Sequence, residues 1–185
     1  MSYFNQSIDD ITKKQVLKGQ QQACRQLYDT FSTPVYNLAY RMLQNTDDAQ
    51  DTMQNSFIIA FQKIAQWSGQ VAFGFWLRKI VVNQCLDQIK KKHQLLTLTI
   101  ESQQHADLNE KIQYDFQHDL NFLMAKLPPL SRSVLWLYEV EGMTHLEIAD
   151  LYKMPTSFSK SQLARSKQLL TKWLQNQEEN NEQRL

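Results

Sequence analysis

The sequence of 185 residues is poor in the two residue types that most often interrupt regular structure, with four glycines and four prolines. Average usage would give roughly 22 of these residues in a chain of this length. Turns must therefore be few and regular segments long. A large multidomain enzyme is excluded, because a domain typically takes about 100 to 150 residues and this chain has room for one domain or two small ones.

Cysteines and long apolar runs are also scarce. Cys24 and Cys85 are the two cysteines, and they form no C-x-x-C pair and have no histidine at ligand spacing. This pattern excludes a zinc site and a disulfide framework, so we expect both to act as small buried hydrophobes. No apolar stretch approaches the roughly 18 residues of a membrane span, and the first residues do not form a secretion signal. We expect a cytoplasmic protein without membrane insertion.

The formal net charge of +1 hides an uneven distribution. Residues 65–95 contain five basic and one acidic side chain, and residues 157–175 contain four basic and no acidic ones. Between them, residues 96–119 contain one basic and five acidic side chains. Two basic patches separated by an acidic stretch predict two places that could meet a polyanion.

Apolar residues recur at helical spacing along the chain, and no strand pattern of weight appears. The first expected helix begins near Cys24, and the second begins at Pro34 with Thr33 as its cap. A third begins at Asp47, where Gln50 completes a capping-box variant. The others are expected at Phe73–Lys92, Leu108–Leu127, Val134–Val140 (closed by Gly142), Thr144–Tyr152 and Ser157–Trp173. Residues 93–107 lose the rhythm and predict a flexible linker. The predicted fold class is all-α, with helical domains at 1–92 and 108–175 and a polar tail at 176–185.

Motifs of catalysis are not visible. Gly69 and Gly74 have the spacing of a phosphate-binding loop, but Phe75 and Trp76 stand where Lys and Ser or Thr would bind phosphate and magnesium. The four histidines do not form an H-E-x-x-H motif. We therefore expect a protein that is not an enzyme and uses no metal or cofactor.

The strongest local pattern is a helix-turn-helix at residues 144–173. Thr144 and Glu147 form a T-x-x-E capping box, and a short turn leads to a last helix that Ser157 can cap. With Ser159, Leu163, Ser166 and Leu170 facing inward, the opposite face is polar and cationic. Base edges would be read by Phe158, Ser161, Gln162 and Arg165, and phosphates by Lys160 and Lys167. The alternative is that these charges are an ordinary solvated helix surface.

A second candidate is the aromatic segment that precedes a basic helix. Trp67, Phe73, Phe75 and Trp76 lie next to Arg78, Lys79 and the run Lys90–Lys92. Rings that stack on bases beside cations that follow the backbone are typical of single-stranded DNA binding. The alternative is that the rings belong to the core. A core position is the simpler interpretation for Phe73 and Trp76. For Trp67 and Phe75 both interpretations, a core position and stacking on bases, stay open.

Together these residues resemble the extracytoplasmic-function RNA polymerase sigma factors of the sigma-70 superfamily. The resemblance covers about residues 23–92 and 120–174. Its motifs are Leu27-Tyr28, Val35-Tyr36-x-Leu38-Ala39-x-Arg41, Asp48-Ala49-Gln50-Asp51-x-x-Gln54, Phe73-x-x-Trp76-Leu77-x-x-Ile80-x-x-Asn83, Leu86-Asp87, Leu127-Pro128-Pro129, Arg132-x-Val134, Glu139-x-Glu141-Gly142, Ile148-Ala149 and Lys160-Ser161-x-Leu163-x-Arg165.

The resemblance implies a role for each unit. Residues 1–92 would be sigma domain 2, docking on the polymerase clamp through Asp48, Asp51 and Gln54. Its loop from Trp67 to Phe75 would capture an unstacked base of the −10 element, with Asn83, Asp87 and Lys90 on the helix beside it. Residues 108–175 would be sigma domain 4, reading the −35 element with the helix from Ser157. The implied partners are core RNA polymerase, duplex promoter DNA, melted single-stranded −10 DNA and an anti-sigma factor.

Some positions depart from the family pattern. Ser68, Gly74 and Val82 stand where the family often has arginine, and Gln162 replaces an arginine. Lys153 replaces the usual glycine of the turn, which predicts a lysine with positive φ. Two alternative functions remain open: a helix-turn-helix regulator that acts without polymerase, and a degenerate sigma-like adaptor.

Overall fold

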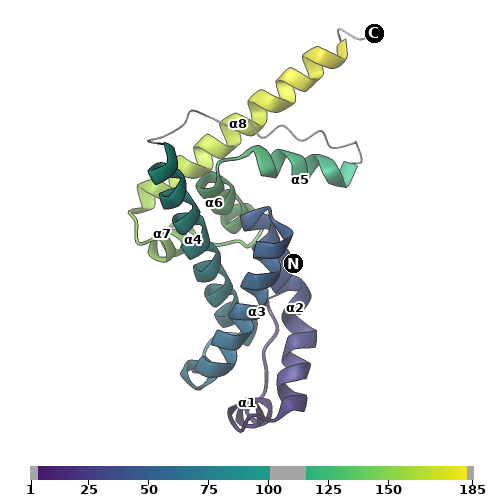
Figure 1. Cartoon of the computed structure of the whole chain (residues 1–185), viewed down its shortest axis with the longest axis vertical. Helices are drawn as coiled ribbons and strands as arrows, with labels where there is room; N and C mark the ends of the chain where they lie inside the picture. Colours follow the sequence, from purple (N-terminus) through teal and green to yellow (C-terminus); the bar gives the residue numbers. More distant parts are fainter. Residues whose placement is uncertain (1–3, 101–115, 183–185) are drawn as a thin grey trace. The chain divides into compact units, whose positions relative to one another are not determined.

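The computed structural model describes residues 4–100 and 116–182, and every regular element within them is helical (Figure 1). The chain divides into two compact units, Met1–Leu95 and Leu96–Leu185. The first contains α1 (Asp10–Leu17), α2 (Gln21–Leu43), α3 (Thr46–Lys63), the 3-10 helix η1 (Ile64–Gln66) and most of α4 (Phe73–Ile100). The second contains α5 (Phe116–Lys126), α6 (Pro129–Glu139), α7 (His145–Tyr152) and α8 (Thr156–Glu182). The predicted all-α fold class with two helical domains is confirmed.

Helix α2 continues through Pro34, so the prediction of a new helix capped by Thr33 was wrong. An interior proline removes a backbone donor and costs roughly 3 kcal/mol. The buried side chains of Phe31, Val35 and Leu38 lie on both sides of the proline and belong to the core of the unit, in which α2 packs against α3. Each contributes about 1.5–3 kcal/mol. The free energy gained by burying one continuous face of α2 therefore exceeds the cost of the hydrogen bond lost at Pro34.

The N-cap of helix α3 lies two residues earlier in the chain than predicted. Its N-cap is Asn45, whose side-chain oxygen accepts from the Asp48 amide at 2.9 Å, and not Asp47. Asp47 and Asp48 instead lie in the first turn, where negative charge suits the helix dipole. The predicted apolar stripe is buried, with Phe61 half-buried at its edge. Two polar residues, Thr52 and Ser56, are also fully buried, and Thr52 Oγ1 accepts from Gln88 of α4 at 2.9 Å.

Helix α4 extends to Ile100, so the first part of the predicted linker at 93–107 is helical. This segment contains several leucines and neither glycine nor proline, and leucine is among the best helix formers. The rest of that linker, and residues 108–115 of the helix predicted at 108–127, lie outside the described residues.

A buried arginine of α6 contacts the C-terminal end of α5. Arg132 is 5% exposed, and its Nη1 donates to the carbonyl oxygens of Met124, Ala125 and Leu127 at 3.3, 3.4 and 3.5 Å. Burial lowers the pKa of Arg132 to about 10, which still leaves a cation at neutral pH. A cation at a helix C-terminus satisfies carbonyls that have no intrahelical partner. Arg132 therefore closes the end of α5.

The helix-turn-helix is confirmed at α7 and α8. Thr144 Oγ1 accepts from the Glu147 amide at 3.2 Å, and the Glu147 carboxylate accepts from the Thr144 amide at 2.8 Å, completing the capping box. Lys153 has φ +54°, the left-handed conformation predicted from the sequence. The Ser157 cap was wrong, because α8 already begins at Thr156, and α8 also continues well beyond Trp173.

Candidate nucleic-acid interface

The two sides of α8 differ in burial as predicted. The inward stripe consists of the buried residues Ser159, Leu163 and Ser166 and the half-buried Leu170. The opposite side is exposed and carries Ser157, Lys160, Ser161, Arg165, Gln168 and Lys172. The first turns of α8 thus present Ser161 and Arg165 to solvent, which is the geometry that a recognition helix needs to reach base edges in a major groove.

Short polar contacts hold α8 in place. Ser166 Oγ donates to the carbonyl oxygen of Ser131 in α6 at 2.8 Å. Ser159 Oγ lies 3.0 Å from Nδ1 of His145, the first residue of α7, and the imidazole stacks on Tyr138 with ring centroids 4.4 Å apart. These contacts tie α8 to α6 and to α7. Support of this kind holds the exposed side chains of α8 in a fixed arrangement.

Three of the predicted DNA-binding side chains of α8 are engaged within the fold. Phe158 is half-buried, with its ring 5.2 Å from that of Tyr152. Gln162 is half-buried and its Oε1 accepts from Ser131 Oγ at 2.6 Å. Lys167 Nζ lies 2.7 Å from Glu139 Oε1, and this contact raises the pKa of Lys167. Sequence spacing within one helix cannot reveal such partners, because they come from other helices.

For Trp67 and Phe73 the structure favours the alternative that their rings belong to the core. Their side chains are 3% and 1% exposed, and the two rings meet edge to face with centroids 5.6 Å apart. Phe73 also packs on Phe31 of α2. A ring that stacks on a base needs an accessible face, so in this conformation both belong to the core of the first unit.

The remaining residues of this candidate site are more accessible. Phe75 and Trp76 are half-buried, and the Arg78 guanidinium lies 4.9 Å from the Phe75 ring centroid. Four exposed side chains follow at helical spacing along one side of α4: Lys79, Asn83, Asp87 and Lys90. We call this side of α4, together with the exposed loop Ser68–Val71, the α4 surface; it contains two lysines and the exposed Val71.

The predicted polymerase-docking residues lie on the outer side of α3. Asp51 and Gln54 are exposed, and Asp48 is half-buried and forms an ion pair with Lys92 of α4. That ion pair crosses from the first turn of α3 to the basic run of α4. Two of the three residues therefore remain directly available to a partner.

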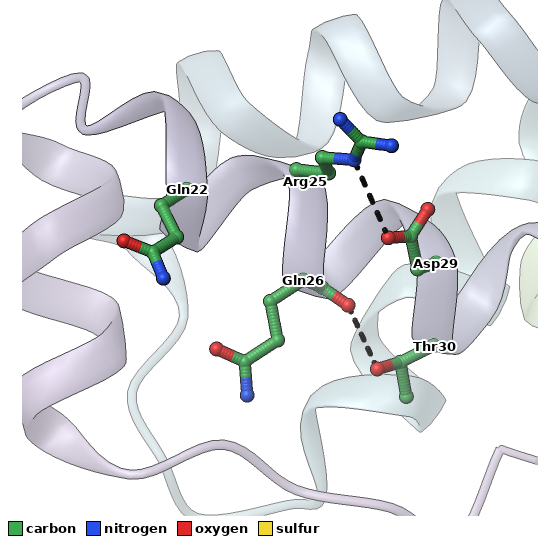
Figure 2. Close-up of a pocket in the computed structure, with 5 residues that line it drawn as sticks. All are labelled: Gln22, Arg25, Gln26, Asp29 and Thr30. Carbon is green, nitrogen blue, oxygen red and sulfur yellow. Dashed lines mark hydrogen bonds and ion pairs between the residues drawn. The ribbon is translucent and has the colours of Figure 1, made fainter.

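An open hollow of about 500 Å³ lies along α2, where Gln22, Arg25, Gln26, Asp29 and Thr30 line it (Figure 2). Within it Arg25 Nε lies 3.7 Å from Asp29 Oδ2, and Thr30 Oγ1 donates to the Gln26 carbonyl at 2.8 Å. None of the helices that the structure describes is long and apolar enough to cross a membrane.

Two protein families match the chain and define the class of protein to which it belongs. The family described as Sigma-70 region 2 matches residues 27–94, and the family Sigma-70, region 4 matches residues 118–170. The first match covers most of α2, all of α3 and most of α4, and the second covers most of α5, all of α6 and α7 and the first part of α8. The α4 surface and the first turns of α8 lie within the matched segments.

Similar whole proteins agree with this class. The chain is 30% identical over 175 residues to the ECF RNA polymerase sigma factor SigW of Bacillus subtilis, covering 87% of this chain and 94% of SigW. It is 24% identical over 192 residues to the RNA polymerase sigma-H factor of Pseudomonas aeruginosa, covering 93% and 96%. The chain therefore belongs to the extracytoplasmic-function RNA polymerase sigma factors, which are transcription initiation factors and not enzymes.

Two solved structures have the same fold. One is CnrH in complex with the cytosolic domain of CnrY, with a TM-score of 0.56, 20% identity, and coverage of 90% of this chain and 96% of that one. The other is the sigma factor RpoE in complex with the anti-sigma factor NepR from Bartonella quintana, with a TM-score of 0.60, 18% identity, and coverage of 82% and 96%.

Proposed function

We propose that the chain joins core RNA polymerase and directs it to promoters that carry a −35 and a −10 element. In this proposal α8 enters the major groove of the −35 element, and the α4 surface takes the −10 element. The observation that carries the proposal is the exposed pair Ser161 and Arg165 in the first turns of a helix whose other side is buried. Arginine donates in a bidentate manner to guanine, which makes Arg165 the main candidate for reading a base.

Opening of the −10 element would use binding energy alone. Unpairing and flipping a base costs a few kcal/mol, and stacking on an aromatic ring gives about 1–3 kcal/mol per base. Because Trp67 and Phe73 are buried, the half-buried rings of Phe75 and Trp76 are the better candidates for that stacking. Lys79 and Lys90 would contact the strand backbone, and Asn83 and Asp87 would offer polar groups to bases.

Docking on the polymerase is assigned to α3. Asp51 and Gln54 supply an exposed polar face, and Asp48 adds a carboxylate whose present partner is Lys92. A polymerase surface with basic residues could replace that lysine. We also propose that an anti-sigma protein holds the chain inactive in the cytoplasm, since both solved structures of the same fold are complexes with a second protein.

One observation favours the adaptor alternative. Of the three positions where the family often has arginine, Gly74 and Val82 are buried, so neither position could expose a cation to DNA in this fold. An adaptor would bind polymerase without selecting promoters. A regulator independent of polymerase would bind specific duplexes alone.

Run-off transcription with added core polymerase on a promoter library separates these functions. The proposal predicts transcripts from a defined subset of promoters that share −35 and −10 sequences, and none from core polymerase alone. Polymerase binding without such transcripts would support the adaptor. Specific duplex binding without polymerase binding would support the independent regulator.

A further inference from the structure

The first described residues of the chain lie against the start of α4. Phe4 is 2% exposed and is among the largest fully buried side chains of the protein. Two residues later, the Gln6 carbonyl oxygen accepts from the Gly74 amide at 3.0 Å. The segment Phe4–Ser7, which we call the N-terminal strap, is thus anchored by one buried ring and one backbone hydrogen bond.

Gly74 makes this contact possible through its size. A Cβ atom at this position would lie 2.3 Å from the Phe4 carbonyl oxygen, 2.8 Å from its carbonyl carbon and 2.9 Å from its Cα. All three are backbone atoms, so no side-chain rotation could relieve the overlap. Any residue other than glycine would displace the strap. Position 74, where the family often has arginine, is therefore a glycine in a chain whose N-terminal strap lies against it.

Helix α1 contacts Trp67, the residue that precedes the loop Ser68–Val71. Lys13 Nζ donates to the Trp67 carbonyl oxygen at 2.6 Å and lies 5.4 Å from the centroid of the Trp67 ring. Trp67 Nε1 in turn donates to the Val71 carbonyl oxygen at 2.9 Å, closing the loop on itself. The exposed loop Ser68–Val71 is consequently fixed by Trp67 at its start and by the strapped start of α4 at its end.

We propose that Phe4, Lys13 and Gly74 are positioning residues that hold the loop Ser68–Val71 ready for an unpaired −10 base. The inference rests on the proposed function, in which this loop belongs to the surface that takes the melted strand. A loop that is already ordered loses less conformational freedom when it binds, so preorganisation increases affinity. None of the three residues needs to touch DNA for this effect.

The test compares Gly74→Ala and Phe4→Ala with Asn5→Ala, a control in the same strap whose side chain is exposed. Gly74→Ala displaces the strap by overlap, whereas Phe4→Ala removes its anchor without overlap, so the two changes reach the same result by different routes. Circular dichroism checks that the helix content of the chain is unchanged. Hydrogen exchange of the amides at 67–74 then reports the order of the loop without any promoter.

We expect faster exchange at 67–74 and about tenfold weaker binding of a single-stranded −10 oligonucleotide by holoenzyme with either variant, a change of about 1.4 kcal/mol. Binding of −35 duplex should stay unchanged, and Asn5→Ala should match the parent chain. Unchanged exchange, or stronger oligonucleotide binding by the variants, would overturn the strap's role. If the parent holoenzyme bound no −10 strand, the proposed function would fail, while exchange would still decide whether the strap orders the loop.

Discussion

The ammonium group of Lys167 lies 2.7 Å from a carboxylate oxygen of Glu139, and this ion pair joins α8 to α6. Both side chains are partly exposed, at 57% and 42%. A lysine that the helix could offer to phosphate is therefore already paired with a carboxylate of its own unit. Any contact between Lys167 and DNA has to compete with this pair.

Replacement of Glu139 by Gln should strengthen DNA binding. The change removes the competing carboxylate and leaves Lys167 available to phosphate, and each added phosphate contact steepens the dependence of log K on log salt by about 0.9. Fluorescence anisotropy with a −35 duplex over a range of NaCl concentrations measures this slope. In the double variant with Lys167→Gln the gain should disappear; a gain that persisted would mean that Glu139 acts by general repulsion and not through Lys167.

Lys153 should lower the free energy of unfolding of the helix-turn-helix, and substitution by glycine should raise it. Lys153 has φ +54°, a region that costs an L-residue with a Cβ roughly 1–2 kcal/mol. Lys153→Gly should therefore increase the protection of α7 and α8 against hydrogen exchange, offset in part by the greater freedom of glycine in the unfolded chain. The matched control is Lys160→Gly in exposed helix, which should lower protection by about 1 kcal/mol. A loss of protection in both variants would show that the left-handed lysine is not strained.

The success of sequence reasoning at Lys153 and its failure at Pro34 have different physical origins. The turn conformation, the Thr144 capping box and the inward stripe of α8 follow from local rules that act within one or two turns of chain. Whether α2 ends at Pro34 is decided by packing of its buried face against α3, which outweighs the local preference. Local rules therefore predicted the turn, the capping box of α7 and the inward stripe, although they misplaced the starts of α3 and α8.

The candidate site shows the same limit. The exposure of Arg165 and Ser161 follows from helical spacing, so both could be predicted. The burial of Trp67, by contrast, depends on contacts with Phe73 and with Lys13, which lies 54 residues away in the chain. Gln162 is engaged by Ser131, 31 residues away. Contacts over such separations leave no periodic pattern in the sequence.

Reversal of charge at Asp51 should weaken assembly with core polymerase. Asp51 is exposed on the outer side of α3, so Asp51→Lys should leave the fold intact while placing a cation in the proposed docking face. Asp29→Lys is a matched control, because Asp29 is an exposed acid of the same unit on α2. Its pairing with Arg25 is an i,i+4 surface contact of about 0.3–0.5 kcal/mol.

Native gel electrophoresis or surface binding with purified core polymerase measures the effect of the two charge reversals. Asp51→Lys should lower affinity at least tenfold at low salt, and Asp29→Lys should change it little. Equal loss in both variants would indicate a general effect of charge. Normal assembly of Asp51→Lys would remove this side of α3 from the docking face.

Truncation of Arg165 should weaken recognition of the −35 duplex. If Arg165 donates two hydrogen bonds to a guanine, Arg165→Ala should cost about 1–3 kcal/mol and relax selectivity at one base pair. Arg165→Lys keeps the charge but not the bidentate geometry, so it should restore nonspecific affinity without restoring selectivity. Gln168→Ala, on the same exposed side of α8 but farther from its first turns, is the control and should have little effect. Competition binding against duplexes changed one base pair at a time would show which pair Arg165 reads. Equal discrimination by the parent chain and Arg165→Ala at every position would assign this arginine to the phosphate backbone.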